Sequence, residues 1–194
     1  MAYITFADII RPVAKKQALE YDFILVVLGS LFIALTAQIT ITLSLVPITG
    51  QTFGILLIAA MFGRYRGTAS VLLYLSEGAM GLPVLAGATG GWIHFVGPTG
   101  GYLIGFIGAA YVVGLLSEKG WDRRFTTTIL AMLLGNSVVY LFGLLWLTRF
   151  VDDVFITGLN PFILGDTLKL LLATLLLPSG WKLLALSKGK SESI

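Results

Sequence analysis

Residues 22–43 read DFILVVLGSLFIALTAQITITL and carry no charged side chain after Asp22. An α-helix needs about 20 mostly apolar residues to cross the hydrocarbon core of a bilayer, so this stretch predicts a transmembrane helix. Five further apolar stretches follow it along the chain. They cover residues 51–63, 68–80, 101–117, 125–148 and 161–186. The sequence therefore predicts an all-α integral membrane protein with six transmembrane helices.

The composition also indicates a lipid environment. Of the 194 residues, 57% are hydrophobic and only 12% are charged, whereas about 25% of the residues in soluble domains are charged. A soluble fold of this size has no interior large enough for so much apolar surface. The chain contains no cysteine, which excludes disulfides, thiolate metal sites and cysteine nucleophiles. Its net charge of +3 is too small to indicate a nucleic-acid partner.

The stretch between the third and fourth predicted helices is rich in residues that break helices. Residues 81–91 read GLPVLAGATGG and residues 97–101 read GPTGG. A regular helix through these residues would be weak, yet the stretch is apolar and unlike a flexible linker. We therefore expect residues 81–100 to form a structured loop that folds back at membrane depth and caps an outward-facing pocket. Such backbone is tolerated in a membrane only where protein covers it or where it lines a cavity.

The basic residues predict the orientation of the chain. With six spans, eleven of the thirteen lysines and arginines fall on the side that also holds both termini: Arg11, Lys15, Lys16, Arg64, Arg66, Lys119, Arg123, Arg124, Lys182, Lys188 and Lys190. Cytoplasmic loops carry an excess of positive charge, so both termini are predicted to be cytoplasmic. Residues 1–21 are interpreted as a cytoplasmic lead-in rather than a removable signal peptide, and residues 187–194 as a cytoplasmic tail.

Small residues recur at helical spacing on two of the predicted helices. Gly97, Gly101, Gly105 and Ala109 follow one another every four residues, a pattern that lets helices approach closely. We expect this series to pack against other helices of the same chain. Ser30, Ala34 and Ala37 form a similar face on the first helix. For that face, packing within the chain and contact with a partner subunit both remain open.

Apart from Asp22, which begins the first span, and Lys182, which is counted above with the cytoplasmic charges, three charged residues fall inside predicted spans: Glu77, Asp166 and Lys169. A charge at the centre of a bilayer costs about 2.5–3.5 kcal/mol on insertion scales, so such residues are usually functional or paired. Asp166 and Lys169 are three residues apart and therefore share one helix face. They form either a structural ion pair or a polar clamp for a ligand. We favour the clamp, because a carboxylate accepts N–H bonds while an ammonium donates them.

Several other residues are candidate ligand contacts. Asn136 and Tyr140 are four apart and can point inward together, although polar residues satisfied within the core show the same spacing. Glu77 contacts the ligand or is solvated near the outer membrane surface. Trp92 covers the ligand or lies at the membrane interface as an aromatic anchor. His94 is the only histidine and lacks the neighbours of a metal site, so we expect a loop anchor or lid residue and no bound metal.

Motifs for common enzyme chemistry are absent from the sequence. There is no GxxxxGK[ST] phosphate loop, no HExxH zinc motif and no GxSxG nucleophile elbow. The triplet 189–191 reads GKS but lacks the upstream glycine, since residue 184 is leucine. We therefore predict that the chain is not an enzyme and does not itself hydrolyse ATP.

Several segments together resemble the BioY family, the biotin-specific S components of energy-coupling factor (ECF) transporters. The matching stretches are VPITGQT at 46–52, Tyr74 and Leu75 with Gly78, GLPV at 81–84, GPTGGYLIGF at 97–106, GLNPF at 158–162, and Gly165, Asp166 and Lys169. The resemblance implies a six-helix fold with a pocket near the outer face and Asp166 and Lys169 inside it. It also implies biotin as ligand, no cofactor, and a transmembrane coupling subunit and two ATPase subunits as partners.

Two other functions remain open at this stage. A proton-coupled secondary carrier would use Glu77 or Asp166 as its proton site, because intramembrane carboxylates serve that role in many carriers. No inverted-repeat pattern supports this alternative. An intramembrane enzyme would use Asp166 or His94 as acid or base, but no second group lies at a useful spacing from either residue.

Overall fold

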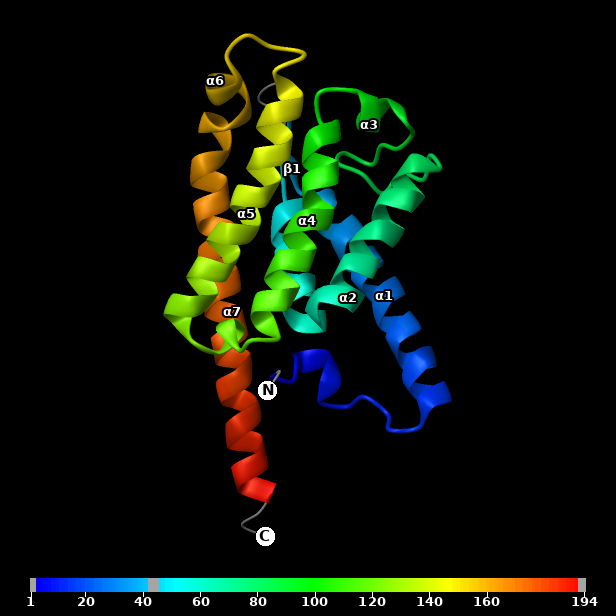
Figure 1. Ribbon diagram of the computed structural model, residues 1–194, viewed down its shortest axis with the longest axis vertical. Coiled ribbons are helices and arrows are strands. Elements are labelled where there is room, and N and C mark those ends of the chain that lie inside the picture. Colours follow the sequence, from blue (N-terminus) through cyan, green and yellow to red (C-terminus); the bar gives the residue numbers. More distant parts are fainter. Residues whose placement is uncertain (1–2, 42–45, 192–194) are drawn as a thin grey trace.

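The computed structural model describes residues 3–41 and 46–191, and it is almost entirely helical (Figure 1). In this described part of the chain, five long helices form the body, and short elements connect them. The long helices are α1 (Lys15–Ala37), α2 (Gln51–Ala79), α4 (Gly100–Ser117), α5 (Phe125–Leu147) and α7 (Ile163–Ser191). The short elements are the 3-10 turns η1 (Phe6–Asp8), η2 (Trp121–Arg123) and η3 (Asn160–Phe162), the helices α3 (Ile93–Val96) and α6 (Val154–Gly158), and the paired strands β1 (Thr40–Ile41) and β2 (Ile48–Thr49).

Within residues 3–41 and 46–191, five helical segments are long and apolar enough to cross a membrane: Lys15–Ala37, Gln51–Ala79, Gly100–Ser117, Phe125–Leu147 and Val154–Leu186. The prediction of an all-helical, multi-pass membrane protein is therefore confirmed. The second of these segments contains both of the stretches 51–63 and 68–80 that the sequence predicts as separate helices. Its path through the membrane consequently decides whether the chain has five spans or six.

The helix α2 doubles back on itself at Gly63. Gly63 has φ 81° and ψ 177°, a backbone conformation that is open almost only to glycine. The Gln51 side-chain amide donates to the Tyr74 hydroxyl, although these residues are 23 positions apart. A straight helix would separate them by about 35 Å. Figure 1 shows the cyan first half of α2 running down the molecule and the second half returning upward.

Small residues allow the close packing around this reversal and between the other helices. A Cβ on Gly67 would lie 2.7 Å from the Ala59 Cα, and one on Gly105 would lie 3.0 Å from the Val139 Cα of α5. Gly101 faces α5 in the same way, and Ala109 is fully buried. These members of the predicted series therefore pack within the chain, as expected. Gly97 lies just before α4 rather than on it.

The small face of α1 also packs inward. Ser30 and Ala37 are fully buried, and the Ser30 hydroxyl donates to the Glu77 carboxylate on α2 at 2.6 Å. The outward face of α1 instead carries large apolar side chains such as Leu31 and Leu35. The interpretation of Ser30, Ala34 and Ala37 as a partner interface is therefore wrong for Ser30 and Ala37, because their side chains are already covered by the chain's own helices.

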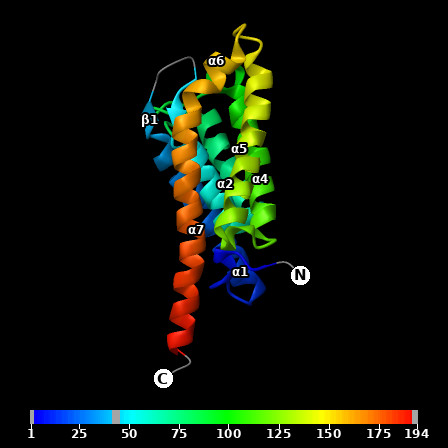
Figure 2. The same cartoon turned by 90° about the vertical axis from the view of Figure 1, so that its left-hand side faces the viewer.

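The N-terminal segment joins several helices at one end of the molecule. The Phe6 ring lies 4.2 Å from the Trp181 ring of α7, and the Tyr3 backbone N–H donates to the Glu118 carbonyl at 2.7 Å. Arg66 pairs with Asp8 at the same end. The N-terminal segment, the later part of α7 and the turn of α2 therefore lie together at this end of the molecule (Figure 2). This is the end where the sequence groups most of the positive charge.

Some predicted boundaries differ from the structure. The helix predicted for residues 22–43 begins at Lys15 and ends at Ala37; residues 42–43 lie outside the described part of the chain. Asn160 and Pro161 form a 3-10 turn before α7, and residues 187–191 of the predicted tail continue that helix. The short helix α6 was not predicted. Asp153 caps it by accepting the N–H groups of Phe155 and Ile156 at 3.1 and 3.0 Å.

Candidate ligand-binding site

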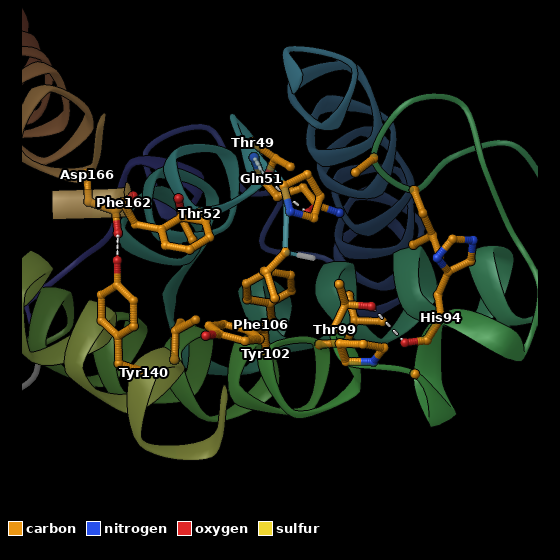
Figure 3. Close-up of a pocket in the computed structure, with 18 of the residues that line it drawn as sticks. Thr49, Gln51, Thr52, His94, Thr99, Tyr102, Phe106, Tyr140, Phe162 and Asp166 are labelled. Carbon is orange, nitrogen blue, oxygen red and sulfur yellow. Dashed lines mark hydrogen bonds between the residues drawn. The ribbon is translucent and has the colours of Figure 1, made fainter. Parts of the chain in front are cut away.

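A cavity of about 400 Å³ lies among the helix ends opposite the N-terminal segment (Figure 3). Small-molecule sites have volumes of about 300–1,000 Å³. Its walls come from six regions of the chain: β2 with the two residues before it, the start of α2, the loop before α4, the first half of α4, the second half of α5, and η3 with the start of α7. Along α4 the lining runs from Thr99 to Phe106, which corresponds to about 10 Å of helix. The cavity is therefore long enough for an extended small molecule.

A cluster of four polar side chains occupies one end of the cavity. Asp166 is 6% exposed and accepts hydrogen bonds from Asn136 Nδ2 at 2.9 Å, from the Tyr140 hydroxyl, and from Lys169 Nζ at 2.8 Å. The structure thus brings together all four of the residues that helical spacing grouped in pairs. Lys169 Nζ also donates to Thr52 Oγ1 at 3.1 Å. The paired charges give this end strong donors and acceptors but little net charge.

Local sequence explains how these side chains meet. Asn136 and Tyr140 are one turn apart on α5, and Asp166 and Lys169 are one turn apart on α7. The turn η3, with Pro161 in its first turn, fixes where α7 begins. Thr52 belongs to the first turn of α2, directly after the Gly50 cap. Two helices therefore present this cluster on rigid backbone, and a third places Thr52 beside it.

The middle of the cavity combines apolar walls with an oriented amide. Phe106, Val139 and Phe162 line the walls. The Gln51 amide oxygen accepts from Thr49 Oγ1 at 3.0 Å, and its nitrogen donates to the Tyr74 hydroxyl. The Tyr102 hydroxyl donates to the Gly158 carbonyl at 2.9 Å and so ties α4 to α6. These bonds hold the lining side chains in fixed positions.

The loop before α4 forms the other end of the cavity. Leu85, Thr89, Ile93 and His94 line it, and Figure 3 shows His94 on the side of the pocket opposite Asp166. The His94 carbonyl accepts the Thr99 hydroxyl at 2.9 Å, and the Trp146 ring N–H donates to the Gly97 carbonyl at 2.9 Å. The loop is therefore anchored to the start of α4 and to α5.

A family model described as the BioY family matches residues 13–186. The chain belongs to the BioY family. The probable biotin transporter BioY of Pyrococcus horikoshii is 43% identical over 147 residues, which cover 73% of this chain and 86% of the relative. The biotin transporter BioY of Thermotoga maritima is 41% identical over 147 residues, with 74% and 86% covered. The resemblance that the sequence motifs indicated is thereby confirmed.

A solved structure supports the same assignment. The crystal structure of the S-component for biotin from an ECF-type ABC transporter matches with a TM-score of 0.72 and 28% identity, covering 88% of this chain and 95% of that chain. The BioY family is a family of transporter subunits rather than of enzymes, which agrees with the absence of catalytic motifs from the sequence.

Two predicted ligand contacts of this BioY chain lie outside the cavity. Glu77 is not among the residues that line it; its carboxylate bonds to Ser30 between α1 and α2 instead. Trp92 is 68% exposed and packs against Phe95, while its neighbours Ile93 and His94 line the cavity. Placing Trp92 in the pocket was wrong because α3 turns that indole outward, where it suits a membrane interface.

Sequence reasoning missed Gln51 and Thr52 as pocket residues. Both belong to the VPITGQT stretch that carries part of the BioY resemblance, but neither is charged, so neither stands out in an apolar span. Their position in the chain was the one available indication. Polar residues directly after a break such as Pro47–Gly50 lie in the first turn of the next helix, where side chains face the end of the helix bundle. The partner of Gln51, Tyr74, cannot be found from spacing because the reversal at Gly63 brings them together.

Proposed function

We propose that this chain binds biotin in the cavity and delivers it across the membrane as the substrate-specific subunit of an ECF-type transporter. The observation that carries the proposal is the Asp166 cluster at one end of a mostly apolar pocket, in a chain of the BioY family. The names of its relatives, which are biotin transporters, support the choice of ligand.

The chemistry of biotin fits the two kinds of surface in the pocket. Its ureido group offers two N–H donors and one carbonyl acceptor. A carboxylate has about four lone-pair sites, and three donors already occupy sites on Asp166, so one more N–H can bind there. Lys169 and Asn136 are donors placed beside that carboxylate. The apolar walls formed by Phe106, Val139 and Phe162 suit the thiophane ring and the aliphatic chain.

In this proposal the chain crosses the membrane six times, because α2 crosses once on each side of Gly63. The bond between Gln51 and Tyr74 supports two antiparallel halves. Each half is shorter than the roughly 20 residues that a spanning helix needs. Residues 81–99 therefore lie partly at membrane depth, where the cavity and the neighbouring helices shield their backbone, and cap the pocket on the outer side.

The same arrangement places both chain ends and the α2 turn in the cytoplasm and the α5–α6 connection outside. The chain has no cysteine, so single introduced cysteines report the orientation cleanly. In intact cells, a membrane-impermeant maleimide is expected to label Asp152→Cys and to leave Tyr65→Cys unlabelled until the membrane is permeabilised. Both side chains are exposed in the structure. Labelling of Tyr65→Cys in intact cells would contradict the orientation.

The proposed partners are a transmembrane coupling subunit and two ATPase subunits. In cells without other biotin uptake, co-expression of the chain with such an energising module is expected to give uptake that survives a protonophore. An ATPase-inactive module should abolish it. Glu77, an intramembrane carboxylate bonded to a serine rather than to a cation, favours the alternative of a proton-coupled carrier. Uptake by the chain alone that collapses with the protonophore would establish that alternative.

A further inference from the structure

The two ends of the cavity differ in their polar groups. Among the described residues that line it, Asp166 is the only aspartate or glutamate, and Lys169, beside it, is the only lysine or arginine. The Lys169 ammonium is 2.8 Å from the Asp166 carboxylate, which neutralises it. A ligand carboxylate at this end would have to compete with Asp166 for the Lys169 ammonium and would then lie beside a second carboxylate in a poorly solvated site, an arrangement that like-charge repulsion disfavours.

The opposite end offers one uncommitted side-chain donor. Thr89 Oγ1 donates to the Ala86 carbonyl and Thr99 Oγ1 donates to the His94 carbonyl, each at 2.9 Å. The imidazole of His94 makes no hydrogen bond or ion pair with any residue in the described ranges 3–41 and 46–191. A neutral imidazole donates one N–H and a protonated imidazole donates two, so either form can bind a carboxylate.

The backbone holds His94 in place for such a contact. Its N–H donates to the Gly91 carbonyl at 3.3 Å, and its carbonyl accepts the Thr99 hydroxyl at the start of α4. Gly91 has φ 103°, which lets the chain turn sharply into α3 and aim residues 93 and 94 at the cavity. The backbone of His94 is therefore fixed before a ligand arrives, which reduces the ordering cost of binding.

We propose that His94 binds the carboxylate of the ligand and makes the pocket selective for the free acid over uncharged derivatives. This inference rests on the proposed function and assigns the direction in which biotin lies: the ureido head at Asp166, and the acid tail at the loop end. The cavity runs along about 10 Å of α4 between these two ends, so one extended molecule can reach both.

The test compares biotin with biotinamide, which replaces the carboxylate by a neutral amide and keeps the head unchanged. Titration calorimetry on the purified full-length chain is expected to show tighter binding of biotin than of biotinamide. His94→Leu should lower the affinity for biotin about tenfold, as expected for loss of a hydrogen bond to a charged group. The same variant should change the affinity for biotinamide less than twofold. His94→Gln, which keeps an N–H donor, should recover part of the affinity for biotin.

Val96→Ala is the matched control, because Val96 lies on the same short helix, is exposed and does not line the cavity. It should leave both affinities unchanged. Equal weakening of both ligands by His94→Leu, or wild-type protein that binds biotinamide as tightly as biotin, would overturn the proposal. These outcomes differ from failure of the proposed function, in which folded wild-type protein would bind neither ligand.

Discussion

Replacing Asp166 by asparagine is expected to weaken biotin binding by more than about 100-fold. The carboxylate accepts bonds from Asn136, Tyr140 and Lys169 and is almost fully buried. An amide of the same shape has one acceptor oxygen, and it leaves the Lys169 ammonium without its counter-ion. Losing a hydrogen bond from the ligand to a charged group costs up to about 3 kcal/mol, and a Lys169 ammonium without its counter-ion weakens the neighbouring ligand contacts further, which together correspond to about two orders of magnitude or more in affinity.

The measurement is calorimetric titration of the purified variant with biotin, after gel filtration and thermal unfolding show that it remains folded. Thr167→Ala serves as the control. Thr167 is the next residue on α7, its side chain is exposed, and its hydroxyl bonds only to the Ile163 carbonyl of its own helix. We expect Thr167→Ala to bind biotin as the wild type does. Unchanged biotin affinity in Asp166→Asn would show that the polar cluster is not part of the binding site.

Replacing Gly101 by valine is expected to destabilise the fold by about 3 kcal/mol. A Cβ at this position would overlap the Trp146 Cβ and would lie 2.5 Å from the Phe142 carbonyl oxygen, so α4 and α5 must separate. Overpacking of a well-packed core costs about 1–3 kcal/mol, and a clash with backbone lies at the upper end of that range. The Trp146 ring N–H also donates to the Gly97 carbonyl, so displacing Trp146 should weaken the attachment of the pocket loop to α5 as well.

Thermal unfolding in detergent, followed by gel filtration or by tryptophan fluorescence, measures the effect of Gly101→Val. Gly108→Val, on the same helix, is the control, since its Cβ would meet only the Val138 Cγ1 methyl at 3.0 Å and the Phe142 ring edge at 3.8 Å. Those side-chain atoms can move aside. We expect the control to unfold close to the wild-type temperature; equal stability of the two variants would refute close α4–α5 packing at Gly101.

Regular helices made part of the site predictable. The pairs Asn136 with Tyr140 and Asp166 with Lys169 were grouped by spacings of four and three residues, and both pairs lie on unbroken helices. The cost of intramembrane charge predicted only that Asp166 and Lys169 are functional or paired; it did not predict that the two pairs meet. The structure adds the contact between the pairs, through the Asp166 carboxylate.

Irregular backbone limited what the sequence could predict. The orientation of Trp92 depends on the turn at Gly91, and the pairing of Gln51 with Tyr74 depends on the turn at Gly63. Neither the Trp92 orientation nor the Gln51–Tyr74 pairing follows from composition, because a glycine permits many backbone conformations and tertiary contacts select one of them. The face of Ser30 and Ala37 was ambiguous for another reason: small residues suit contact with the chain's own helices as well as with a partner, and only burial distinguishes the two.

Direct titration of the purified wild-type chain with biotin tests the central claim most directly, with mass spectrometry to detect biotin retained through purification. The pocket lined by the Asp166 cluster, the apolar walls and the loop residues predicts saturable binding of one biotin per chain. Excess free biotin should prevent binding of a labelled biotin analogue. Folded protein that neither retains biotin nor binds it on titration would contradict the assignment of this pocket, while leaving the helical membrane architecture intact.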